Sequence, residues 1–356
     1  MTSRERITAA FQHRQADRTP YFEYVLLSPL ADRLLGHPYA GDPQNWDDFV
    51  QLKGWKDAVH QSAVDQLDLS LRLGYDMMYV VPNLTPPAPY REATTLLGTD
   101  VADPVERVRM RNEQATLTAP PSEDTLLVYG YLKEEMRNRG VDLPILAPAY
   151  VHGVWTDTDL METMILAPEV AHCHFSLATA SALACIEKYV ALGIDQIGVG
   201  GDFSGTHPLI SPKVYREFIV PEVRTLSRFI HQANRYAINA SDGNLWPVLD
   251  DFLFGCEVDG YLEIDLFAGM DMGKLKSVCG DRITLYGNLD CGNMLSFGTP
   301  EEVRLHTIGC LQAGMGNGGH ILCASNAITA SVPLENYLAV INAYREMFDL
   351  PKFELN

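Results

Sequence analysis

RYAINASDGN (residues 235–244) begins as a short apolar run, which predicts a β-strand, and ends in a polar turn. The chain repeats this unit through its C-terminal third, each time followed by an amphipathic helix pattern. The four predicted strands are residues 235–240, 260–264, 282–287 and 319–323, and their turns read SDGN, EID, GNLDC and ASN. Strands that alternate with helices are typical of a β/α barrel, in which the C-terminal ends of the strands carry the chemistry. The repeat therefore predicts a barrel enzyme.

Four earlier strand patterns bring the predicted number of strands to eight. They lie at residues 21–27, 77–81, 144–151 and 195–200, and the first helix pattern, residues 2–11, precedes them all. Residues 82–122 differ in character, because proline and threonine are frequent and residues 105–118 alternate polar and apolar side chains. This alternation predicts a hairpin inserted after the second strand. We expect an α/β fold, a (β/α)8 TIM barrel with N-terminal helices, as one domain over residues 1–356.

Composition and charge narrow the class of partner. The formal net charge of −19 argues against binding to nucleic acid or to an anionic membrane, since both need basic patches. No run approaches the roughly 20 apolar residues needed to cross a bilayer, and the first residues lack the features of a secretion or transit signal. The seven cysteines include no CxxC pair, which favours reduced thiols over a disulfide framework. We expect a cytoplasmic protein.

Three carboxylates are the candidate catalytic residues. Asp242 follows the strand at residues 235–240, where it either serves the site or caps the helix predicted near Asn244. Glu263 ends a buried strand, and a buried carboxylate needs a partner or a role. Asp202 lies in GVGGDFSGTHP (residues 198–208), where glycines free the backbone for close approach to a ligand, although it can also be a simple turn residue.

Four further residues are candidates for substrate binding. His152 and His207 follow the third and fourth strands and can exchange protons near neutral pH, unless they are solvated bystanders. Asn288 lies in the turn after the seventh strand, which either shapes the pocket floor or only ends the strand. Asn326 follows the eighth strand and can both donate and accept hydrogen bonds.

Several segments together resemble the uroporphyrinogen decarboxylase superfamily, which includes the cobalamin-dependent and corrinoid-dependent methyltransferases. The resemblance covers nearly the whole chain and depends on the set of segments rather than on any one of them. The segments are TSRERITAAFQHRQADRTP (residues 2–20), LRLGYDMMYV (71–80), LISPKVYREFIVPEV (209–223), SDGNLWPVLDDF (241–252), AGMDMGKLK (268–276), YGNLDCGNML (286–295) and VPLENYLAVINAYRE (332–346).

Resemblance to the true decarboxylases implies residues that this chain lacks. They carry an arginine-rich segment after the first strand, whereas FEYVLLSPLADRL (residues 22–34) has no arginine before Arg33. Their catalytic aspartate after the second strand corresponds to Asn83, a further candidate substrate-binding residue, and their site tyrosine falls near Val154 and Trp155. Because paired guanidinium and carboxylate groups supply much of such recognition, an octacarboxylate tetrapyrrole is expected to bind poorly.

Resemblance to the zinc methyltransferases also implies ligands that are missing. Their His-x-Cys pair, their second Cys and, in some members, a Glu correspond to Ala240, Asp242, Asn326 and Glu263. Only the glutamate is kept, although Asp242 still offers oxygen and Cys323 lies at the end of the eighth strand. A thiol-activating zinc site is therefore not expected, and whether another metal binds stays open. The residues fit a pocket lined by oxygen atoms.

The leading hypothesis is methyl-group transfer between a small methylated substrate and a corrinoid protein, which would supply the cofactor. Asp202, Asp242 and Glu263 would orient or protonate the substrate heteroatom as its methyl group leaves. Decarboxylation of uroporphyrinogen or of a smaller acid is the enzymatic alternative, and a non-catalytic ligand-binding or subunit role is the other, since one scaffold supports many chemistries. The resemblance also implies a homodimer.

Overall fold

The computed structural model describes residues 1–85, 101–116 and 123–355. It contains two compact units. Unit 1 comprises Met1–Asn83, Leu126–Leu146 and Gly260–Asn356, and unit 2 comprises Leu84–Thr125 and Ala147–Asp259. That residues 1–356 form a single domain stays a prediction.

The predicted α/β class is confirmed, because every strand pairing recorded in the described residues is parallel. In unit 1, β1 pairs with β2, and β5, β6 and β7 pair in chain order, whereas in unit 2 β3 pairs with β4. Almost all of the strand residues are buried. The strands are β1 (Met78–Tyr79), β2 (Ile145–Pro148), β3 (Gln196–Gly200), β4 (Tyr236–Ala240), β5 (Gly260–Leu262), β6 (Thr284–Tyr286) and β7 (His320–Ile321). All seven occur where the sequence predicts a strand, and each is shorter than predicted.

The segment predicted as the first strand, residues 21–27, pairs through isolated bridges rather than a continuous ladder. Tyr21 bridges Leu322 and Leu26 bridges Ile328, both in parallel orientation. On its other side, the carbonyl of Tyr21 accepts a hydrogen bond of 2.7 Å from the backbone N–H of Asp76, just before β1. Within unit 1 this segment therefore joins the β7 side to the β1 side.

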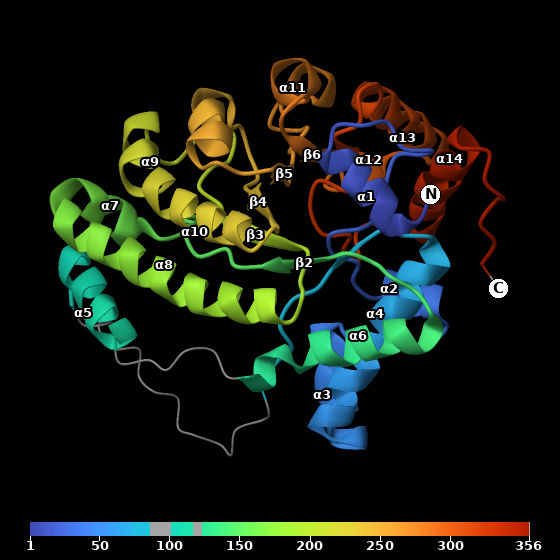
Figure 1. The fold of residues 1–356 in the computed structure, drawn as a ribbon, viewed down its shortest axis with the longest axis horizontal. Helices are drawn as coiled ribbons and strands as arrows, with labels where there is room; N and C mark the ends of the chain where they lie inside the picture. Colours follow the sequence, from blue (N-terminus) through green and yellow to red (C-terminus); the bar gives the residue numbers. More distant parts are fainter. Residues whose placement is uncertain (86–100, 117–122, 356) are drawn as a thin grey trace. The chain divides into compact units, whose positions relative to one another are not determined.

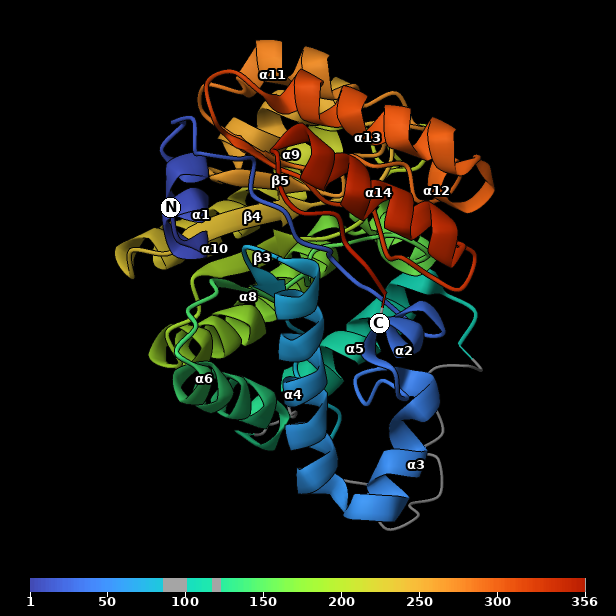
Figure 2. The ribbon, with the colours of Figure 1, turned by 90° about the vertical axis from the view of Figure 1, so that its right-hand side faces the viewer.

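The helices of unit 1 cover these strands. Figure 1 shows α4 beside α6, and Figure 2 shows α13 beside α14, and both pairs pack closely. At the start of α1, Thr2 accepts a hydrogen bond from the backbone of Glu5, and Glu5 accepts one from the backbone of Thr2, a capping box that fixes where the helix begins. The helices are α1 (Ser3–Phe11), α2 (Leu30–Leu35), α3 (Pro43–Lys53), α4 (Trp55–Leu73), α6 (Leu127–Arg139), α11 (Met272–Cys279), α12 (Met294–Phe297), α13 (Pro300–Gly314) and α14 (Leu334–Met347).

The helices of unit 2 include two places where the chain departs from a regular helix. The helical stretch from Pro212 to Gln232 is interrupted at Ile219, because Pro221 in the next turn has no backbone N–H to donate. After β4 the predicted helix is reduced to a 3-10 turn and a short π-helical turn. The elements are η1 (Glu123–Leu126, at the border with unit 1), α5 (Pro104–Thr116), α7 (Thr158–Leu166), α8 (Pro168–Ala191), α9 (Pro212–Phe218), α10 (Val220–Gln232), η2 (Trp246–Val248) and η3 (Asp251–Gly255).

The hairpin predicted from residues 105–118 is wrong, because Pro104–Thr116 form helix α5. The backbone N–H of Val105 donates to the side chain of Asp103 at 2.9 Å, which marks the start of the helix. The buried residues Val108 and Asn112 are four apart, the spacing of one helix face. The alternation of polar and apolar side chains therefore occurs by chance in a segment that is helical. The remainder of the predicted hairpin, residues 86–100 and 117–122, lies outside the described residues.

A buried ion cluster ties the N-terminal segment of unit 1 to β1. The side chain of Asp76 has no solvent exposure and accepts hydrogen bonds from Arg6 (3.0 Å) and Arg18 (3.1 Å). It also accepts one from the Ser3 hydroxyl (2.9 Å) and one from the backbone N–H of Tyr21 (3.2 Å). With four donors the charge is well compensated, which is the condition under which a buried carboxylate is tolerated.

Candidate functional site

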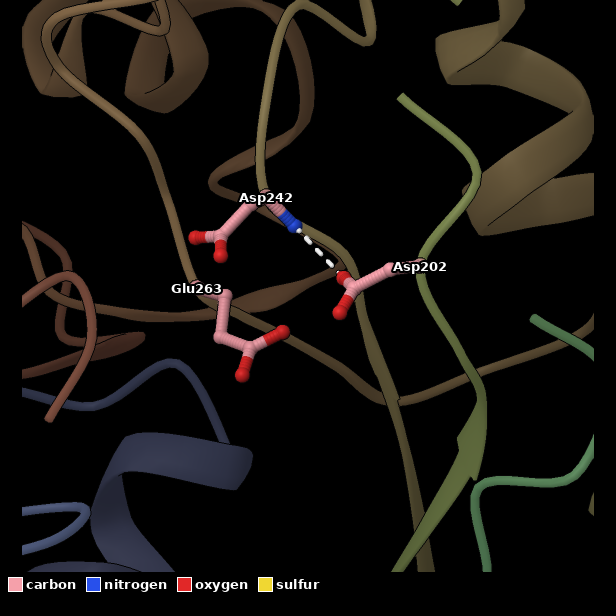
Figure 3. Close-up of side chains that lie close together, drawn as sticks. All are labelled: Asp202, Asp242 and Glu263. Carbon is pink, nitrogen blue, oxygen red and sulfur yellow. Dashed lines mark hydrogen bonds between the residues drawn. The ribbon is translucent and has the colours of Figure 1, made fainter. Parts of the chain in front are cut away.

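Asp202 and Asp242 meet at the C-terminal ends of β3 and β4. The two strands pair with Gly200 opposite Ala240, so each aspartate lies two residues beyond a paired position. Figure 3 shows the result, in which the backbone N–H of Asp242 donates to Oδ1 of Asp202 at 3.0 Å. Both side chains are partly exposed. Sequence reasoning predicted that both aspartates end strands, and within unit 2 the structure brings them together.

The backbone of Asp202 is held by the turn that follows β2. Its carbonyl accepts hydrogen bonds from the N–H groups of Val154 (2.8 Å) and Trp155 (3.0 Å). Gly201 has φ +135°, and a Cβ there would lie 2.8 Å from the backbone nitrogen of Gly153. Only glycine permits this conformation together with this approach, as the glycine-rich sequence indicated.

The turn that follows Asp242 is shaped by the next two residues. At the start of η2 the side-chain oxygen of Asn244 accepts a hydrogen bond of 3.1 Å from the backbone N–H of Trp246. Asp242 itself lies before Gly243, which has φ +87° and whose Cβ would clash with the Gly205 carbonyl at 2.4 Å. The turn geometry thus comes from Gly243 and Asn244, and the capping role of Asp242 stays a prediction.

Glu263, in unit 1, follows β5 in an unusual backbone conformation. Its φ is +68°, in the left-handed region that residues with a side chain rarely adopt, and it is only 7% exposed. Strained positions of this kind cluster at functional sites. Burial raises the pKa of Tyr79, and the Glu263 carboxylate adds to the increase. Tyr79 in turn lies against Tyr24, with ring centroids 4.3 Å apart.

The two candidate histidines differ in their surroundings. His152 is fully buried in unit 2, and its Nε2 lies 2.8 Å from the hydroxyl of Thr179 on α8. Burial lowers its pKa to about 4, so the ring is neutral at physiological pH. His207 is exposed, and its carbonyl accepts the backbone N–H of Gly205. The structure therefore directs His152 toward a helix rather than toward solvent.

The three candidate asparagines all bond to nearby protein groups. Asn83 accepts a hydrogen bond of 3.0 Å from the backbone N–H of Val128, and so caps the start of α6. Asn288 is buried and donates to the carbonyl of Met270 at 3.0 Å. Asn326 accepts the N–H of Ala327 at 2.6 Å. Each has a structural task, and their roles in substrate binding stay predictions.

Glu23, in unit 1, is a buried carboxyl group that the sequence analysis did not single out. It is 5% exposed and accepts hydrogen bonds from the backbone N–H of Ala324 (2.9 Å) and the hydroxyl of Tyr21 (3.2 Å). Burial raises its pKa from 4.5 to about 7. The sequence could indicate that Glu23 needs a partner, since it is a lone glutamate in the apolar run at residues 21–27. It could not indicate which partner, because that residue lies near the other end of the chain.

We expect Glu23→Gln to flatten the pH dependence of stability. The folded protein holds the Glu23 proton more tightly than the unfolded chain does. The contribution of this proton to the free energy of unfolding is therefore complete below about pH 4.5 and is lost as the pH rises through about 7. A neutral amide has no such proton, so the decline in the free energy of unfolding should shrink by up to about 3 kcal/mol. Urea unfolding at about pH 5 and about pH 8 measures this. Parallel declines in both proteins would contradict it.

Burial disfavours the thiolate form of the cysteines near Glu23. Cys323 is fully buried, and burial, with Glu23 nearby, raises its pKa well above the usual value. Burial also raises the pKa of Cys291, although the Ser325 hydroxyl and the backbone N–H of Asn326 hydrogen-bond to its sulfur. With Ala240 and Asn326 at two of the resembled ligand positions, the donor set does not fit a thiol-activating zinc site.

Metal analysis of the purified protein by inductively coupled plasma mass spectrometry should therefore find zinc well below one equivalent. The reason is that a thiolate zinc site needs sulfur and imidazole ligands, whereas Ala240, Asp242 and Asn326 stand at those positions here. Stoichiometric zinc that disappears in Asp242→Ala and Cys323→Ala would overturn this expectation. The exposed Cys173, replaced by alanine, is the matched control, since it lies on α8 and its loss should leave the metal content unchanged.

None of the described helices combines the length and the apolar character needed to cross a bilayer.

Comparison with known proteins identifies the family of this chain. Residues 144–347, more than half of the chain, match the model of the uroporphyrinogen decarboxylase (URO-D) family. A methyltransferase from Methanosarcina mazei has the same fold, with a TM-score of 0.68 and 19% identity over 98% of this chain and 99% of that one.

Curated relatives carry two kinds of name. A methylated-thiol–coenzyme M methyltransferase of Methanosarcina mazei is 26% identical over 59% of this chain and 53% of its own length. A uroporphyrinogen decarboxylase of Coxiella burnetii is 26% identical over 49% of this chain and 47% of its own length. The chain thus spans about half the length of the curated relatives it matches. It is a member of the uroporphyrinogen decarboxylase (URO-D) family.

Proposed function

We propose that this protein transfers a methyl group between a small methylated substrate and a corrinoid protein. The observation that carries the proposal is the Asp202–Asp242 pair, in which the carboxylate of Asp202 accepts the backbone N–H of Asp242 at the C-terminal ends of paired strands. Glu263 follows β5 in the same way. From the sequence pattern, in which polar residues follow successive strands, we propose that Glu263 serves the same site as the two aspartates, as one set of three carboxylates.

These carboxylates fit the chemistry of a methyl group that leaves a heteroatom. When the carbon–heteroatom bond breaks, the electron pair stays on the heteroatom, which then needs a proton to become a good leaving group. A partly buried carboxyl group can supply that proton, and a neighbouring carboxylate can orient the substrate by hydrogen bonding. Asp242 and Glu263 take these two tasks in our proposal, and Asp202 holds Asp242 in position. The corrinoid, carried by its own protein, accepts or donates the methyl group.

The comparisons support methylated thiols as the substrate class. The relative from Methanosarcina mazei is named for a methylated thiol and for coenzyme M, and the solved structure with the same fold is a methyltransferase. The net charge of −19 agrees with a substrate or partner that is not strongly anionic. His207, Asn326, Asn288, Asn83 and His152 are proposed to line or support the substrate site.

The test uses free methylcobalamin as a surrogate for the corrinoid protein and coenzyme M as the thiol. Protein-dependent loss of the methylcobalamin spectrum, with an equal amount of methylated coenzyme M, is expected. The reverse reaction, from a methylated thiol to reduced cobalamin, is measured in the same way. Absence of turnover in both directions, with a corrinoid-protein fraction also inactive, would reject methyl transfer.

Decarboxylation is the second candidate, favoured by the relatives that are named uroporphyrinogen decarboxylases. It conflicts with the segment at residues 22–34, which has no arginine before Arg33 and so lacks the groups that pair with carboxylates. Incubation with uroporphyrinogen separates the two candidates, because decarboxylation yields carbon dioxide and less carboxylated porphyrins. A ligand-binding role without catalysis would show as affinity that survives Asp242→Ala and Glu263→Ala.

Three broader features complete the proposal. We propose a single domain, a homodimer and a cytoplasmic location. The first follows from the barrel pattern of the sequence, the second from the resemblance to the superfamily, and the third from the sequence composition and the reduced cysteines.

A further inference from the structure

His152, Thr179 and Glu222 form a chain of side chains inside unit 2. His152 follows β2, Thr179 lies in the middle of α8, and Glu222 is in the first turn of α10. Nε2 of His152 lies 2.8 Å from the Thr179 hydroxyl oxygen, and that hydroxyl donates to Oε2 of Glu222 at 2.5 Å. His152 is 0% exposed and Thr179 is 5% exposed. The chain thus runs from a partly exposed carboxylate to a buried imidazole.

The direction of these hydrogen bonds fixes the tautomer of His152. Thr179 has one hydroxyl proton and gives it to the Glu222 carboxylate, so its oxygen must accept a proton from Nε2 of His152. The ring therefore carries its proton on Nε2, and burial keeps it neutral. Phe175 stacks on the ring with centroids 6.3 Å apart, which further limits its rotation.

The segment fixed in this way supports the backbone of Asp202. The N–H of His152 donates to the carbonyl of Gly200 at 2.9 Å. Two and three residues later, the N–H groups of Val154 and Trp155 donate to the carbonyl of Asp202, at 2.8 Å and 3.0 Å. The position of the His152 ring therefore determines where the N–H groups of Val154 and Trp155 lie. These groups in turn hold the turn that contains Asp202.

We propose that Glu222, Thr179 and His152 are positioning residues that hold the Asp202 turn, and so aim the Asp202 carboxylate at the N–H of Asp242. This inference rests on the proposed function only for the expected effect on catalysis, since the hydrogen bonds themselves do not depend on that function. His152 acts through Asp202 in this inference and does not touch substrate. The Asp202–Asp242 bond drawn in Figure 3 is the contact that the chain controls.

The test compares three substitutions of buried threonines. Thr179→Val removes the hydroxyl at nearly constant volume, and Thr179→Ser keeps it. Thr163→Val is the matched control, because Thr163 is also buried in unit 2 but its hydroxyl donates to the carbonyl of Asp159 within its own helix. In each variant, ¹⁵N NMR gives the tautomer of His152 and the chemical shift of the Asp242 amide, which reports its bond to Asp202.

We expect Thr179→Val to abolish the fixed Nε2–H tautomer and to shift the Asp242 amide, and Thr179→Ser to restore both. The methyl-transfer kcat should fall by up to roughly a hundredfold in Thr179→Val with little change in KM, since catalysis is sensitive to misplacement of about 1 Å. An Asp242 amide that is unchanged in Thr179→Val, or equally changed in Thr163→Val, would overturn the inference. If the wild-type protein transfers no methyl group, the proposed function fails, and the amide shift still decides whether the chain positions Asp202.

Discussion

Glu263→Gln is expected to lower the kcat of methyl transfer by roughly 100- to 10,000-fold, the usual contribution of a general acid or base. The amide has the same shape as the acid and can occupy the same left-handed backbone position, φ +68°, so the fold should be retained. It cannot deliver or receive the proton that the leaving heteroatom requires. Steady-state kinetics with methylcobalamin and coenzyme M measures the effect.

The Asp242→Asn variant and the double variant test whether the carboxylates work as one set. Residues that act as a unit in catalysis are strongly non-additive, so the double variant should be scarcely slower than the slower single variant. Asp281→Asn is the control, because Asp281 is an exposed acid before β6, at the opposite end of the strand from the site. Multiplicative losses in the double variant, or a kcat for Glu263→Gln equal to that of the control, would contradict the proposed set.

Asp76→Ala is expected to destabilise the protein by about 3–5 kcal/mol, the cost of removing one partner from a buried ion cluster. Arg6 and Arg18 would lose their shared buried carboxylate, and the N–H of Tyr21 would lose its acceptor. Burial itself raises the pKa of Asp76, and the two arginines oppose that increase, so the charge of the group depends on them. Urea unfolding followed by tryptophan fluorescence measures the free energy of unfolding.

Asp142→Ala is the matched control for this prediction. Its carboxylate pairs with Arg4 in the same unit, but the side chain is 66% exposed, and exposed pairs contribute less than about 1 kcal/mol. Equal losses of stability in the two variants would show that burial of Asp76 does not determine the cost. A loss in Asp76→Ala below about 1 kcal/mol would show that the cluster is dispensable.

The parts of the fold that the sequence predicted are those that depend on neighbouring residues. β4 was predicted at residues 235–240 and is Tyr236–Ala240, because a short, mostly apolar run that ends in a polar turn is a local signal of a buried strand. Asp202 and Asp242 were also predictable as site candidates, since a polar residue after each parallel strand lies at the same edge of the sheet.

The parts that the sequence did not predict depend on residues far apart in the chain. Glu23 accepts a hydrogen bond from the N–H of Ala324, 301 residues away, and no local sequence pattern predicts this contact. The direction of the His152 side chain depends on Thr179 and Glu222, which belong to two later helices. Asn83 caps α6 by accepting the N–H of Val128, 45 positions later, so this role could not be predicted from the local sequence either.

Asp202 joins the turn to the rest of unit 2 mainly through its carbonyl, which receives the N–H groups of Val154 and Trp155. Every amino acid has that carbonyl, whereas the carboxylate belongs to aspartate alone. Architecture and reactivity are therefore carried by different atoms of one residue. In evolutionary terms, a single codon change at this position can exchange the reactive group while the loop around it persists. A lineage can in this way acquire a new reaction without passing through an unfolded ancestor.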